Sequence, residues 1–172
     1  MFRSLWLSPP LVTVLAACCF CTPALAADTG CQPVFEASAR LYTMPAHLYT
    51  TMSGATSEQI YANSAIFTNV GGKWHRSKMT LQEMQKQEQE NIRNSKTTCR
   101  YLRDEMVSGE MAALYAEQGE TQGMKFDGQV WISKGKGVLL RTQEDMDAGE
   151  GAKNHIAVRY EYSNVKPPAG VQ

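Results

Sequence analysis

The chain has 172 residues with 17 basic and 17 acidic side chains, and 43% of its residues are hydrophobic. This length and composition fit a single globular domain that can bury a core. The balanced charge provides no basic field that would attract nucleic acid, so we expect no nucleic-acid partner.

The start of the chain has the organisation of a secretory signal peptide. Arg3 supplies a positive charge, residues 11–20 form a short apolar segment, and residues 24–26 (Ala-Leu-Ala) form a cleavage site. A transmembrane helix needs roughly 20 apolar residues, and prolines interrupt this stretch. We therefore expect residues 1–26 to be removed, the mature protein to reach the periplasm, and no transmembrane segment to remain.

A second processing route remains open at Cys18. Residues 15–18 (Leu-Ala-Ala-Cys) fit a bacterial lipobox, in which this cysteine would be lipidated and would become the first residue. The acyl chain would add about 0.8 kcal/mol of membrane affinity per buried methylene group. The two routes predict different locations, either free in the periplasm or anchored by lipid to a membrane.

Two cysteines, Cys31 and Cys99, follow the signal peptide. An even number of cysteines in an oxidising compartment predicts a disulfide. A Cys-x-x-Cys spacing is absent, which disfavours a metal site or a catalytic thiol pair. The bridge would close a loop of about 69 residues and would stabilise the fold by roughly 4 kcal/mol in the chain-entropy description.

Two segments of the mature chain predict helices. The segment from Pro33 to Tyr42 has apolar residues at helical spacing, with its proline in the first turn. A second helix is expected over Leu81 to Ile92, because Thr80 and Glu83 have the spacing of a capping box. The apolar stripe of this second helix is thin, so we expect the helix to lie on the surface and to pack along one narrow edge.

The other segments predict strands separated by turns and by polar loops at residues 119–123 and 145–154. The strands are expected at residues 47–52, 58–68, 73–77, 98–107, 111–118, 124–133, 138–144 and 155–162. Short turns between successive strands are typical of an antiparallel meander. The predicted fold class is therefore α+β, with a long, curved antiparallel sheet and one or two helices packed on it.

One predicted hairpin resembles a known family. Residues 128–141 (Gly-Gln-Val-Trp-Ile-Ser-Lys-Gly-Lys-Gly-Val-Leu-Leu-Arg) are similar to a hairpin of the outer-membrane lipoprotein-sorting (LolA-like) superfamily. There, a strand ending in Trp-Ile-Asp turns through a glycine into Leu-Pro-Leu-Arg. Ser133 replaces the aspartate here, and Val138-Leu139 replaces Leu-Pro. The order of elements is similar over most of the mature chain, and the resemblance is closest to uncharacterised periplasmic members of the superfamily.

The resemblance implies an unclosed half-barrel, in which a strongly bent antiparallel sheet carries helices on its concave side. It also implies a cavity between the sheet and the helices, where better-known members of the superfamily hold lipid acyl chains. Residues 27–166 would form one LolA-like domain, and residues 167–172 would be a frayed tail. Because the mature chain is shorter than a full carrier, we expect a smaller cavity or one filled by side chains.

Strand aromatics and apolar residues are the candidate ligand-binding side chains for a concave face. They are Tyr61, Phe67, Trp74, Met106, Leu114 and Trp131. Alternation along a strand places Val130 and Ile132 on the face opposite to Trp131. The sequence leaves open which of these two faces is concave.

The eight methionines after Met1 allow three interpretations. Flexible thioether side chains suit an adaptable acyl-chain cavity, and they suit gap filling in an ordinary core equally well. A copper(I) site near Met44, His47 and Met52 is the third interpretation, although a Met-x-x-Met cluster and a histidine pair are both missing. We expect no resident metal or cofactor.

The remaining patterns do not predict catalysis. The serines lack a Gly-x-Ser-x-Gly context, and neighbouring carboxylates on a strand point to opposite faces. We therefore expect a periplasmic, non-enzymatic binding or carrier-like protein that holds an apolar or acyl-chain ligand between sheet and helices. The alternative is an envelope protein-interaction module with a filled core, which docks a protein partner through an edge strand and binds no small molecule.

Overall fold

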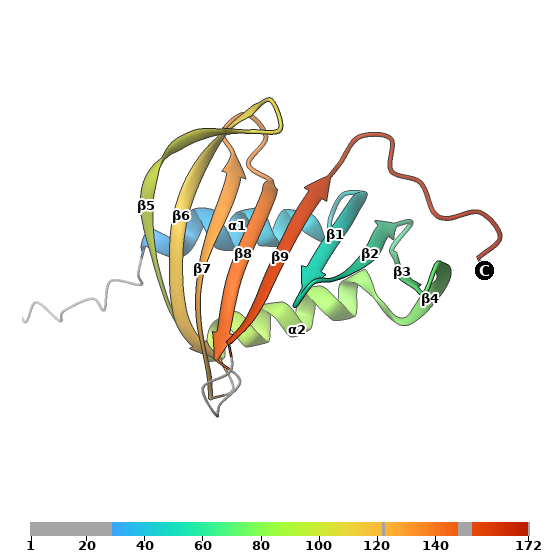
Figure 1. Cartoon of the computed structure of the whole chain (residues 1–172), viewed down its shortest axis with the longest axis horizontal. Coiled ribbons are helices and arrows are strands. Elements are labelled where there is room, and N and C mark those ends of the chain that lie inside the picture. Colours follow the sequence, from blue (N-terminus) through green and yellow to red (C-terminus); the bar gives the residue numbers. More distant parts are fainter. Residues whose placement is uncertain (1–28, 122, 148–152, 172) are drawn as a thin grey trace, which may run out of the picture.

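The computed structural model of the chain describes residues 29–121, 123–147 and 153–171 (Figure 1). The predicted signal peptide and the lipobox at Cys18 lie outside these residues. A 3-10 turn at Thr29–Cys31 leads into helix α1 (Gln32–Leu41), and helix α2 spans Leu81–Asn94. Neither helix is long and apolar enough to cross a bilayer.

Within the described residues, nine strands form one antiparallel sheet. They are β1 (Ala46–Met52), β2 (Ala55–Ala62), β3 (Ala65–Val70), β4 (Lys73–Thr80), β5 (Lys96–Val107), β6 (Glu110–Thr121), β7 (Met124–Ser133), β8 (Leu139–Asp147) and β9 (Lys153–Glu161). Their order across the sheet is β4-β3-β2-β1-β9-β8-β7-β6-β5. The sheet is therefore open, with β4 and β5 at its two edges.

The sheet consists of two meanders, β1–β4 and β5–β9, which α2 connects along the chain. The pairing of β1 with β9 joins them into one surface, with His47 opposite Glu161. In Figure 1 the long strands β5 to β9 curve together and the helices run across them. The fold is thus the predicted α+β half-barrel, a curved and unclosed antiparallel sheet with two helices.

The main hydrophobic core lies between the helices and the concave face of the sheet. Helix α1 contributes Val34, Ala37 and Leu41 to this core, which is the helical spacing seen in the sequence. Val130 and Ile132 of β7 belong to the same buried cluster. The concave face is therefore the face of Val130, and Trp131 points away from it.

The predicted disulfide is present between Cys31 and Cys99, with an S–S distance of 1.99 Å and a sequence separation of 68 residues. It joins the residue that precedes α1 to the edge strand β5. The bridge holds the start of the helix against the sheet, next to the space described below.

The strand boundaries differ from the prediction in the first meander and at two loops. Residues 58–68, which suggested one strand, contain the end of β2, a turn and most of β3. Asn63 and Ser64 have φ values of 52° and 61°, the left-handed conformation that a two-residue hairpin turn needs. Strands β6 and β8 extend to Thr121 and Asp147, into segments predicted as loops, because ladder pairing with β7 overrides their polar composition.

The C-terminal segment packs on the outer face of the sheet. Val165 and Val171 contact the buried cluster that contains Ile60 and Phe67, and Figure 1 shows the segment running from β9 toward β2 and β3. The sequence predicted a frayed tail over residues 167–172. The contact of Val171 buries apolar surface, which offsets part of the entropy lost on ordering the described part of this tail.

Candidate functional site

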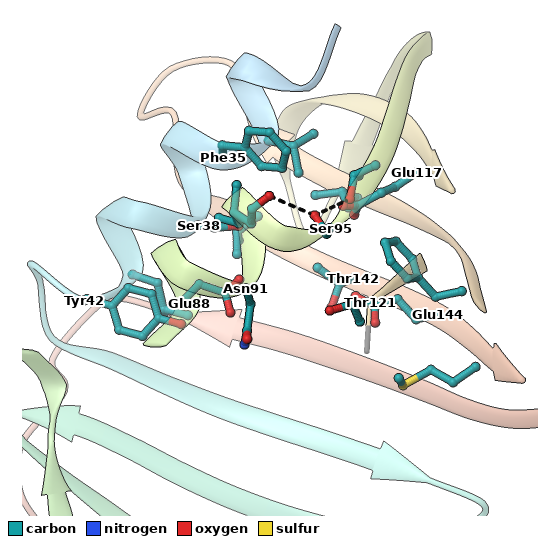
Figure 2. A pocket seen from close by; sticks show the side chains of 18 of the residues that line it. Phe35, Ser38, Tyr42, Glu88, Asn91, Ser95, Glu117, Thr121, Thr142 and Glu144 are labelled. Carbon is teal, nitrogen blue, oxygen red and sulfur yellow. Dashed lines mark hydrogen bonds between the residues drawn. The ribbon is translucent and has the colours of Figure 1, made fainter. Parts of the chain in front are cut away.

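A cavity of about 300 Å³ lies between the two helices and the concave face of the sheet (Figure 2). Helices α1 and α2 form one side, and strands β5 to β9 form the other. Ligand pockets in proteins usually span roughly 300–1,000 Å³, so this cavity is at the lower end of that range. Its volume corresponds to roughly ten water molecules in the liquid.

An adjoining space of about 210 Å³ lies between α1 and α2. The two spaces share Phe35 of α1, Tyr42 just after the end of α1, and Glu88 and Ile92 of α2. Arg93 lines the second space and not the first. The cavity against the sheet is thus continued by the space between the two helices.

Apolar side chains form much of the cavity wall. Phe35 of α1 and Ile92 of α2 face Phe126 and Val130 of β7, and Met146 of β8 adds a thioether. Such a wall favours binding of an apolar group, because burial removes the group from water. The gain is about 0.8 kcal/mol per buried methylene.

Three carboxyl groups also line the cavity, and each comes from a different element. Figure 2 shows Glu88 of α2, Glu117 of β6 and Glu144 of β8 around it. Glu117 pairs with Gly128 across β6 and β7, and Gly128 pairs with Glu144 across β7 and β8. Residues in one cross-strand row share a face of the sheet, so the ladder itself directs both glutamates to the concave side.

Gly128 is the middle residue of this row and leaves space for the acidic side chains. A Cβ atom at this position would lie 2.9 Å from Cγ of Glu144 and 2.6 Å from the carbonyl oxygen of Gln143. The Glu144 side chain therefore lies over Gly128, between its own strand and the strand of Glu117. Glu117 and Glu144, on either side of Gly128 in this row, line the sheet side of the cavity.

The surroundings of these carboxyl groups raise their pKa values. Burial raises the pKa of Glu117 to about 7, with added repulsion from Glu144 and Glu88. Burial also raises the pKa of Glu144, with a contribution from Glu88, and the pKa of Glu88. No described basic side chain forms an ion pair with any of the three.

Hydroxyl groups and the side-chain amide of Asn91 make up the rest of the polar lining. The Thr142 side chain is 8% exposed, and its hydroxyl oxygen lies 3.4 Å from that of Tyr160. Burial raises the pKa of Tyr160 and of Tyr42, so both phenols stay protonated at neutral pH. Ser95 donates a hydrogen bond to the carbonyl oxygen of Ile92 at 3.0 Å and is therefore engaged within the protein.

The six residues predicted to bind ligand all lie outside the lining of the two spaces. Leu114 and Trp131 form a buried cluster on the outer face, and Phe67 and Trp74 belong to the other outer cluster. Tyr61 is in the main core, where its hydroxyl lies 3.4 Å from the Met84 sulfur. The side chain of Met106 is 60% exposed at the sheet edge.

The methionines do not form a thioether-rich cavity. Met146 lines the cavity. Five of the eight methionines after Met1 are exposed, namely Met52, Met79, Met106, Met111 and Met124. Among the described residues, no group of three or more His, Cys, Asp or Glu side chains is arranged to hold a metal ion.

The sequence of α2 already indicates that Glu88 faces the interior. Leu81, Met84, Glu88 and Ile92 recur at helical spacing, so Glu88 occupies a core-facing position in an otherwise apolar stripe. A charged residue in such a stripe points to a polar cavity or to a buried partner. The glutamates of β6 and β8 carry no comparable local signal, because their convergence depends on strand pairing.

Comparison with known proteins identifies similar folds. No protein-family model and no curated protein sequence matches this chain. The Mycobacterium tuberculosis lipoprotein LppX is similar over 78% of this chain and 98% of its own, with 10% identity and a TM-score of 0.45. LprF from Mycobacterium bovis is similar over 81% of this chain and 96% of its own, with 8% identity and a TM-score of 0.48. The curved, unclosed sheet with two helices is itself the architecture that the resemblance to the LolA-like superfamily implies.

Proposed function

We propose that the mature chain is a non-enzymatic, carrier-like binding protein of the periplasm, which holds an apolar or acyl-chain ligand between its sheet and its helices. The observation that carries this proposal is the cavity of about 300 Å³ between the helices and the concave face. The proposal includes export by the signal peptide at residues 1–26, and one domain over residues 27–166.

The dimensions of the cavity limit the ligand. A volume of roughly ten water molecules accommodates a chain of about eight to ten methylene-sized groups. The adjoining space of about 210 Å³ between α1 and α2 can take a further part of a longer molecule. We therefore propose that one medium-length alkyl chain, or one segment of a lipid, occupies the cavity.

The lining also supports a binding role without catalysis. The described part of the lining lacks histidine. The hydroxyl of Ser95 donates a hydrogen bond to a carbonyl oxygen and lies 2.9 Å from the Thr97 hydroxyl. General-base activation of a hydroxyl nucleophile needs a base within hydrogen-bond reach. Glu88, Glu117 and Glu144 are the carboxyl groups of the lining with raised pKa values. Burial accounts for each shift, with added repulsion from Glu88 at Glu144 and from Glu144 and Glu88 at Glu117.

Native mass spectrometry of the gently purified protein, together with displacement of an uncharged fluorescent alkyl probe, tests this proposal. We expect a bound lipid or a saturable probe signal. Ser38 faces the cavity from α1, whereas Glu36 on the same helix is exposed. Ser38→Phe should fill the cavity and abolish binding, and Glu36→Phe should retain it. Absence of both lipid and probe binding in the unmodified protein would refute the proposal.

The edge strand β5 and its neighbour β6 favour a second candidate function. Tyr101, Met106 and Met111 are 51%, 60% and 45% exposed on this hairpin. An open sheet edge with exposed apolar side chains can pair with an extended segment of another protein. A protein-interaction role of this kind, in the cell envelope, is the proposal that would follow if no ligand enters the cavity.

A further inference from the structure

We infer that the cavity selects an amphipathic cation, meaning an amine or similar cationic group on an alkyl chain, and disfavours the anion of a free fatty acid. This inference rests on the proposed binding function, since it concerns the headgroup of the ligand in the same cavity. It is carried by the cavity between the sheet and the helices, together with the charge of the groups that line it.

The acidic groups reach the cavity from both of its sides. Glu117 and Glu144 line the cavity from the sheet, on either side of Gly128, and Glu88 comes from α2 opposite them (Figure 2). Their placement follows from two independent parts of the fold, the β6-β7-β8 register and the core-facing stripe of α2. An alkyl chain against Phe35 and Val130 would hold its headgroup within the space that these carboxyl groups border.

The other titratable groups around the cavity do not supply a positive charge. Tyr42, just after α1, and Tyr160 of β9 face it and remain neutral, because burial raises the pKa of each phenol further above neutral pH. Among the residues that the structure describes, the lining contains no lysine, arginine or histidine. Arg93 lines the adjoining space between the helices, where it does not pair with any described carboxylate.

The charge of the headgroup decides how it interacts with this environment. Each carboxylate loses hydration in the cavity and is repelled by the other two, and a cation relieves both costs through charge-assisted hydrogen bonds. A fatty-acid carboxylate would instead bring a further negative charge into the same space. A neutral alcohol can donate one hydrogen bond but leaves the repulsion in place.

Proton exchange on binding should differ in sign between these ligands. Near pH 7 the Glu117 carboxyl is partly protonated. A cation stabilises the carboxylate, lowers its pKa and causes a proton to be released. A neutral alkyl chain removes more water from the carboxyl group, raises its pKa and causes proton uptake.

Calorimetric titration of the mature, oxidised protein with n-octylamine, n-octanol and n-octanoate tests the inference at matched chain length. At pH 8, where Glu117 is ionised, we expect the amine to bind at least about tenfold more tightly than the alcohol, and the octanoate to bind most weakly. The double variant Glu117→Gln and Glu144→Gln should reduce this preference to less than about threefold. Glu90→Gln, at an exposed position of α2, is the matched control and should retain it.

A second measurement uses the unmodified protein and does not depend on the folding of a variant. Titrations at pH 7 in two buffers of different ionisation enthalpy report the protons exchanged on binding. Proton release with octylamine and uptake with octanol support the inference. Equal or tighter binding of octanol or octanoate, or an amine preference that survives the double substitution, overturns it while the proposed binding function stands. Failure of all three ligands to bind overturns both.

Discussion

Because the pKa of Glu117 is raised, the free energy of unfolding should fall as the pH rises. The substitution Glu117→Gln should remove this pH dependence. Below pH 4.5 this carboxyl is protonated in both the folded and the unfolded chain. Between pH 4.5 and about 7 the unfolded chain has released the proton while the folded protein retains it. Stability therefore falls as the pH rises through this window, and the loss is complete above it.

The magnitude follows from the two pKa values. A pKa raised from 4.5 to about 7 corresponds to about 3 kcal/mol of lost stability at high pH. Part of the loss is already present at pH 5, so the change between pH 5 and pH 8 is about 2.5 kcal/mol. Glu117→Gln replaces the carboxyl with a neutral group of similar shape, and the variant should lack this part of the pH dependence.

Urea unfolding of the oxidised protein, followed by circular dichroism at pH 5 and pH 8, measures the difference. We expect the unmodified protein to lose about 2.5 kcal/mol more than Glu117→Gln between these values. The exposed Glu90 provides the control, since Glu90→Gln should keep the pH dependence of the unmodified protein. If Glu117→Gln and the unmodified protein show the same dependence, then the Glu117 carboxyl is hydrated and the partly buried acidic cavity is refuted.

Three further predictions concern stability and use the same unfolding measurement. Gly128→Ala should cost about 1–3 kcal/mol, because its Cβ would lie 2.6 Å from a carbonyl oxygen of β8, whereas Gly135→Ala, which meets no atom within 4 Å, should be nearly neutral. Reduction of the disulfide should cost about 4 kcal/mol, given its separation of 68 residues; an unchanged urea midpoint would contradict this. Thr80→Ala removes the oxygen that accepts the Glu83 backbone N–H at 3.2 Å and should cost about 1 kcal/mol.

Local patterns were sufficient for many elements of the fold. The helical spacing after Pro33 and the capping box of Thr80 and Glu83 identified both helices, and the capping hydrogen bonds are present. Cysteine parity predicted the bridge between Cys31 and Cys99. These features depend on interactions between residues close in sequence or on the chemistry of the compartment, so a single chain is enough to find them.

The residues that line the cavity were harder to predict, because alternation along a strand defines two faces without saying which one the helices cover. The candidates Leu114 and Trp131 proved to be on the outer face. Val130, one position away, lines the cavity. A shift of one residue along a strand exchanges its faces, so the assignment needed the position of α1 relative to β7.

The sequence by itself determined the α+β class, the two helices, the disulfide and a resemblance to the half-barrel fold. Only the tertiary structure decided that β1 pairs with β9, and that Glu88, Glu117 and Glu144 meet around one cavity. The physical reason is the range of the interactions. Helix caps and turns form between near neighbours, whereas the acidic cavity exists because three strands align in register and a helix 14 residues long crosses above them.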